Sequence, residues 1–144
     1  METQAMGRVV TAAKIQNLGD LFAVQDGRLR PEEVRTVRVD DALVDTGSTS
    51  LSMPKSLIDQ LGLRHFKTRH VRTAAGPLEL RVYDAVRLYV RDRECVSDVT
   101  EIADGCPVLI GQLALEALDL VIDPKNECVT FNPRHGDEHV MELY

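Results

Sequence analysis

The sequence predicts a mostly β domain with two short helices, at about residues 54–61 and 112–118. Residues 34–40 alternate valine with polar side chains, which is typical of a strand with one buried face. Residues 68–83 contain two alternating segments around a small, glycine-containing turn at 74–77, which indicates a hairpin. Pro54 suits the first position of a helix and Gly62 suits its C-terminal cap, so these two residues bracket the first helix.

Turn-forming clusters divide the rest of the chain into short strands. The charged segment 91–94 and the segment 123–126 are expected to be hairpin turns, with 91–94 exposed to solvent. Strands are expected at residues 8–16, 21–24, 86–90, 95–102, 120–122 and 128–131. We expect a single domain over residues 1–132, with extra strands within 1–33, followed by a polar, irregular tail at 133–144.

Composition excludes several classes of protein. With 144 residues, 44% of them hydrophobic, the chain is long enough for one compact domain with a real core. The formal charge of -6 argues against a nucleic-acid surface, and no stretch is apolar enough to span a membrane. The N-terminus lacks the pattern of a signal peptide. Cys95, Cys106 and Cys128 are odd in number and have no metal-binding spacing, so we expect reduced thiols and a cytoplasmic location.

The chain is organised around residues 42–54. The small and apolar residues 42–44 lead directly into Asp45, Thr46 and Gly47. Burying an unpaired carboxylate is costly, so a strand that delivers an acid into a tight turn is a way to aim that acid at a partner. A second apolar run, 107–110, ends at Gly111 and precedes the helix at 112–118.

These parts, in this order, resemble the retropepsin-like (retroviral-type) aspartic proteases. The signature of that family is two apolar residues followed by Asp-Thr-Gly-Ser/Ala, then a hairpin flap, then two apolar residues and Gly before a short helix. The resemblance runs from about residue 34 to residue 132. It implies a closed β-barrel that forms one half of the acid protease fold.

The resemblance also implies an activity. Because this chain has one Asp-Thr-Gly, it implies a homodimeric aspartic endopeptidase. In such a dimer, Asp45 and its symmetry mate share a proton and activate a water that attacks a peptide bond of a peptide or protein substrate. No cofactor, metal, nucleic acid or membrane is implied.

Roles for individual residues follow from the same resemblance. The catalytic set is Asp45, Thr46 and Gly47. Substrate-binding residues are Ser48 beside the acid and the flap residues Thr73, Ala74, Ala75, Gly76 and Pro77. Leu109, Ile110 and Gly111 would support the Asp45 loop by packing around it.

Two positions depart from the retroviral pattern. Thr49 stands where retroviral enzymes have an acid, and Gln112 stands where they have the arginine that pairs with it. Both halves of that ion pair are replaced together, which fits a neutral substitute. Ser48 is the pepsin-like choice at its position, and its hydroxyl could hydrogen-bond the Asp45 carboxylate.

Two other functions remain open from the sequence. One is a non-hydrolytic or highly restricted peptide-binding or dimerisation module on the same fold. The other is a zinc hydrolase, because His135, Glu138 and His139 match the H-x-x-E-H pattern. That chemistry needs a rigid helix and a third ligand, whereas Gly136 weakens any helix there, so a solvated tail is the favoured interpretation.

Overall fold

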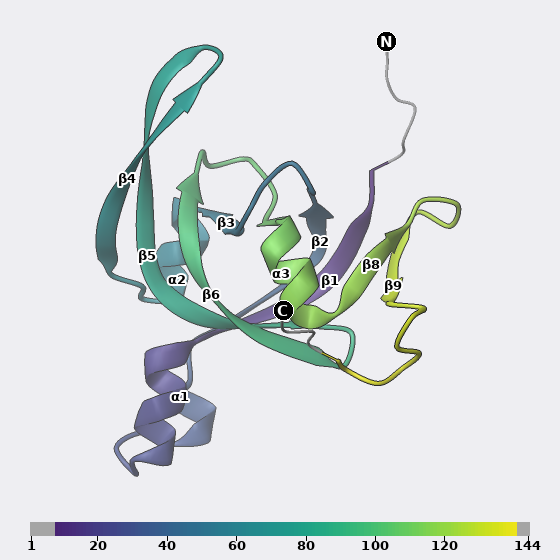
Figure 1. The fold of residues 1–144 in the computed structure, drawn as a ribbon. Coiled ribbons are helices and arrows are strands. Elements are labelled where there is room, and N and C mark those ends of the chain that lie inside the picture. Colours follow the sequence, from purple (N-terminus) through teal and green to yellow (C-terminus); the bar gives the residue numbers. More distant parts are fainter. Residues whose placement is uncertain (1–7, 141–144) are drawn as a thin grey trace.

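A computed structural model of the chain describes residues 8–140. These residues form a mostly β domain, as predicted (Figure 1). The strands are β1 (Val10–Asn17), β2 (Thr36–Val44), β3 (Leu51–Pro54), β4 (His65–Thr73), β5 (Gly76–Val90), β6 (Arg93–Ile102), β7 (Leu109–Ile110), β8 (Leu120–Asp123) and β9 (Cys128–Phe131). The helices are α1 (Leu18–Gln25), α2 (Lys55–Gln60), α3 (Gln112–Leu118) and the short 3-10 helix η1 (Pro31–Glu33).

Seven of the strands form one ring-like sheet. Its order is β1-β2-β7-β3-β6-β5-β4, and β1 also pairs with β5, which joins the two sides of the sheet. The strand β4 pairs with the first half of β5, while β1 pairs with residues in the second half. The strands β8 and β9 form a separate two-stranded sheet.

The core lies inside this ring. Ile15 from β1, Leu51 from β3, Leu88 from β5 and Ile110 from β7 are fully buried. Ile58 of α2 is also fully buried, which ties that helix to the same core. Full burial of one such side chain is worth about 1.5–3 kcal/mol, so these contacts account for the cohesion of strands that are distant in sequence.

The strand predicted at residues 21–24 is wrong, because these residues belong to α1. Asn17 caps this helix: its side chain accepts a hydrogen bond from the Asp20 backbone amide at 3.0 Å, as asparagine commonly does at this position. The Asn17 amide also donates to the Leu61 carbonyl at 2.8 Å, which anchors the start of the helix. The segment before residue 34 therefore contributes β1 and a projecting helix, rather than strands alone (Figure 1).

The strands predicted at 78–83 and 86–90 are one continuous strand, β5. A register irregularity between Tyr83 and Val86 lets β5 bend, so its first half extends the flap hairpin and its second half joins the ring. The helices predicted at about 54–61 and 112–118 are confirmed as α2 and α3. Within the described part of the chain, no helix has the length and apolar character needed to cross a membrane.

Candidate active site

Asp45 follows the last residue of β2, at the point where three strands meet. Val44 lies beside Ile110 of β7 in a parallel pairing, and Ile110 also pairs with Leu51 of β3. The Asp45 backbone amide donates to the Ile110 carbonyl at 2.9 Å. A backbone hydrogen bond therefore holds the acid beside β7, the strand that contains Leu109 and Ile110.

The turn after Asp45 is closed by its own carboxylate. The Gly47 amide donates to Asp45 Oδ1 at 3.0 Å, and the Ser48 amide donates to the Asp45 carbonyl at 3.1 Å. In the described part of the chain the Ser48 hydroxyl forms no hydrogen bond to the Asp45 carboxylate, and the backbone amide of Gly47 is the donor to it. Asp45 is half-buried, whereas Thr46 and Gly47 are exposed.

Gly111 fixes the loop that carries the acid. A Cβ on Gly111 would lie 2.6 Å from the Thr49 carbonyl carbon and 2.7 Å from the Ser48 oxygen, so the loop packs directly against the glycine backbone. The start of α3 adds two hydrogen bonds, from the Gln112 amide to the Ser48 carbonyl at 2.9 Å and from the Leu113 amide to the Thr49 carbonyl at 3.0 Å. The loop is therefore held both by packing against Gly111 and by hydrogen bonds from the start of α3.

At the two positions that depart from the retroviral pattern, the structure shows backbone hydrogen bonds between the loop and α3. The Thr49 carbonyl accepts from the Leu113 amide, and the Gln112 amide donates to the Ser48 carbonyl, so backbone bonds connect the two segments. The Gln112 side chain instead donates to Glu116 at 3.0 Å, one turn further along α3. The backbone contacts hold the loop without the charged pair.

The predicted flap is the hairpin of β4 and β5. Thr73 pairs with Gly76 across a two-residue turn, and its hydroxyl donates to the Gly76 carbonyl at 2.8 Å. Gly76 has a φ of +119°, which glycine adopts more readily than any other residue. Thr73, Ala74, Ala75 and Pro77 are exposed, and the hairpin projects beyond the ring at the end of the molecule where the β2–β3 loop lies (Figure 1).

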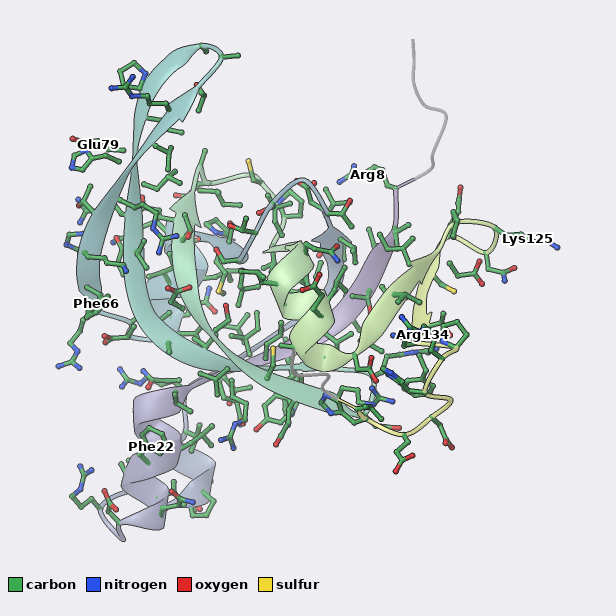
Figure 2. The ribbon with its side chains drawn as sticks, in the orientation of Figure 1. Arg8, Phe22, Phe66, Glu79, Lys125 and Arg134 are labelled. Carbon is green, nitrogen blue, oxygen red and sulfur yellow. The ribbon has the colours of Figure 1, made fainter. Side chains whose placement is uncertain are left out.

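One face of this hairpin is directed to the same side as the Asp45 loop. Val82 of β5 lies opposite Thr100 of β6, and the Thr100 hydroxyl is 3.4 Å from the Ser50 hydroxyl in the loop. Because side chains alternate along a strand, Leu78 and Leu80 share the face of Val82. Glu79 is on the opposite face, and Figure 2 shows it pointing away from the body of the protein. Sequence reasoning did not identify the contact between Ser50 and Thr100.

The two histidines of the tail form hydrogen bonds with residues at the end of α3. His135 Nδ1 lies 2.8 Å from the Asp119 carboxylate, and His139 Nε2 lies 3.0 Å from the Ala117 carbonyl. The Asp119 carboxylate also accepts hydrogen bonds from the Val140 amide and the Asn132 side chain. This segment therefore packs onto the end of α3, and the expectation of a solvated tail is wrong for His135, whose side chain is 13% exposed. Residues 141–144 lie outside the described residues.

The same network bears on the zinc hydrolase interpretation. Burial acts to raise the pKa of the Asp119 carboxyl, but hydrogen bonds from Val140, His135 and Asn132 outweigh it and hold that pKa below its usual range. Within residues 8–140 no group of three histidine, cysteine or acidic side chains is arranged to hold a metal ion. The described residues therefore provide no third ligand beside His135 and His139.

Comparison with known protein families agrees with this geometry. A family model described as aspartyl protease matches residues 31–112, which include Asp45, the flap hairpin and Gly111. The chain belongs to this aspartyl protease family. The match supports hydrolysis of peptide bonds as the general activity of this domain, with a peptide as its substrate. A search of curated proteins finds no match to the chain.

Proposed function

We propose that this protein is a homodimeric aspartic endopeptidase whose active site forms between two chains. The observation that carries this proposal is the geometry at the end of β2. The Asp45 amide bonds to Ile110, Gly111 packs against the loop that follows the acid, and Thr46 and Gly47 are exposed. One carboxylate of this kind is half of the pair that aspartic proteases use, so a second copy related by a twofold axis supplies the other half.

In the proposed mechanism the two carboxylates divide the proton transfers. Two carboxyl groups held close together do not both ionise readily, so the pair retains one proton. The ionised carboxylate takes a proton from a water, which attacks the carbonyl carbon of the scissile peptide bond. The protonated carboxyl polarises the carbonyl oxygen, and a proton is then delivered to the leaving nitrogen. Thr46, exposed in one chain, would brace the two loops across the dimer axis.

The flap would bind the substrate from the other side. An extended peptide beside the β4–β5 hairpin can exchange backbone hydrogen bonds with it, as in strand addition. The apolar Leu78 and Leu80 lie on the face directed toward the Asp45 side, and Leu78 is 48% exposed. Closure of the hairpin would exclude water from the reacting groups.

The test is hydrolysis of a denatured protein at mildly acidic pH. We expect wild-type protein to cleave it, Asp45→Asn to be inactive, and activity to survive EDTA. Loss of activity in EDTA with recovery on added zinc would favour the His135 and His139 site. Absence of cleavage, with retained peptide binding by Asp45→Asn, would favour the non-hydrolytic binding module.

A further inference from the structure

The outer strand of the flap hairpin combines an open edge with an unusual concentration of positive charge. Among residues 8–140, β4 pairs only with β5, so its outer edge keeps backbone amide and carbonyl groups available for another strand. Every residue of β4 except Val71 is exposed, and Phe66 is 66% exposed. The edge is therefore accessible along its whole length.

The cations in β4 and just before it have few carboxylate partners. Arg64, Lys67, Arg69 and Arg72 lie within nine residues of a chain whose net charge is -6, and residues 64–73 contain no acid. Arg64 is paired with Asp84 at 2.9 Å. For Lys67, Arg69 and Arg72 the described part of the chain offers no carboxylate within ion-pair distance, so their charges are available to a ligand.

The register of the hairpin divides these cations between two faces. Lys67 lies opposite Val82 and Arg69 lies opposite Leu80, so both share the face directed toward the Asp45 side. Arg72, opposite Pro77, lies on the other face. Lys67 and Arg69 are two residues apart, which is the spacing of side chains along one face of a strand. A ligand strand with acidic residues at alternate positions would match them.

We propose that the outer edge of β4 binds an extended acidic polypeptide segment as an added strand, with its carboxylates beside Lys67 and Arg69. This inference rests on the proposed function in one respect: an acidic segment bound along β4 would help to determine which substrates the protease takes. Backbone pairing along the edge favours a polypeptide over a nucleic acid, because a nucleic acid has no matching row of amides and carbonyls. Opposite charges on neighbouring strands add to the backbone hydrogen bonds.

The experiment measures binding in the Asp45→Asn protein, so that it does not depend on hydrolysis. A fluorescein-labelled peptide of alternating Glu and Thr is titrated with this protein at low salt, and fluorescence anisotropy is recorded. We expect the double variant Lys67→Glu/Arg69→Glu to bind at least about tenfold more weakly, because two attractive pairs become repulsive. The matched control, Lys125→Glu/Arg134→Glu, changes the net charge equally at exposed sites outside the hairpin and should leave affinity nearly unchanged.

Additional variants and peptides distinguish the contributions of charge and of backbone pairing to binding. Arg72→Glu, on the other face, should weaken binding less than the double variant. A Lys-Thr peptide should not bind, and an acidic peptide N-methylated at alternate residues should lose affinity because it cannot pair along the edge. If the double variant unfolds, as judged by circular dichroism, Lys67→Gln/Arg69→Gln replaces it and should show a smaller loss of affinity in the same direction.

Several results would overturn the proposal. These are equal affinity in the double variant and its control, equal binding of the N-methylated peptide, and equally tight binding of single-stranded DNA. Failure of the proposed function is a separate outcome. If the wild-type protein cleaves no substrate but Asp45→Asn binds the acidic peptide through β4, the proposed binding site is supported and the proposed protease function is contradicted. If the wild-type protein cleaves substrate but its peptide binding does not depend on Lys67 and Arg69, the protease function is supported and the β4 edge site is not.

Discussion

Gly111 lies against Ser48 with no room for a side chain between them: a Cβ on Gly111 would lie 2.7 Å from the Ser48 carbonyl oxygen. The backbone of Gly111, with φ of -87° and ψ of 179°, is open to any residue, so the requirement for glycine is purely one of space. We expect Gly111→Ala to displace the Asp45 loop, to cost about 1–3 kcal/mol of unfolding free energy and to lower hydrolytic activity by more than about tenfold. Chemical denaturation and turnover measure the two effects. Wild-type activity in this variant would mean that the packing of the loop does not position the acid.

Substitution at the tip of the flap should reduce catalytic activity more than it reduces folding stability. Gly76→Val introduces a β-branched residue at a φ of +119°, although no atom lies within 4 Å of the added Cβ. We expect a cost of about 1–3 kcal/mol from backbone strain and a larger relative loss of activity, because the hairpin must approach substrate closely. Gly27→Val is the matched control, since Gly27 also has a positive φ and open space but lies beyond α1. Equal activity in the two variants would show that the tip does not act as a flap.

The Asp119 carboxylate should stabilise the protein in a pH-dependent way. Its pKa in the folded protein is lowered below that of the unfolded chain, near 3.9, so the unfolded state binds more protons in that range. The stabilisation is therefore present above about pH 5 and is lost as pH falls through the folded-state pKa. Asp119→Asn suits the left-handed φ of 56° and should cost about 1–3 kcal/mol at pH 7.

The measurement for this variant is the difference in unfolding free energy between wild type and Asp119→Asn, taken from pH 7 down to pH 3. We expect the difference to shrink as the solution becomes more acidic. Asp92→Asn removes an exposed carboxylate and serves as the control. A difference that stays constant with pH would contradict the assignment of the Asp119 charge to the network with His135 and Val140.

The three thiols should differ in reactivity. Cys106 is exposed, whereas burial raises the pKa of the Cys95 thiol to about 11, and the thiolate is the reactive form. We expect iodoacetamide at pH 8 to modify Cys106 first and Cys95 last in the native protein, with the order assigned by peptide mass spectrometry. Early modification of Cys95 would show that the packing around β6 is looser than described.

Local patterns in the sequence were enough to predict the parts of the site that depend on neighbours along the chain. The apolar run before Asp45 predicted a strand that ends at this residue, and β2 ends at Val44. The second apolar run, before Gly111, was recognised as part of the same motif, and it contains the short strand β7. The flap hairpin was predictable for the same reason. Its register and its turn are set by alternation and by Gly76.

Other features depend on contacts that no local pattern contains. The helix α1 begins where Asn17 caps it and binds Leu61, which is 44 residues further along the chain. The contact between Ser50 and Thr100 joins positions 50 residues apart. The docking of His135 on Asp119 likewise exists only once α3 and the tail have folded together. A polar sequence alone could not distinguish such a segment from a solvated one.

Mixed dimers provide the most direct test of a shared active site. Wild-type protein and Asp45→Asn are combined in a series of ratios at fixed total concentration, left to exchange until activity is constant, and assayed for peptide hydrolysis. If each site needs one Asp45 from each chain, activity follows the square of the wild-type fraction, and an equal mixture retains about one quarter of the full activity. Activity proportional to the wild-type fraction, with about one half retained in the equal mixture, would show that each chain acts alone.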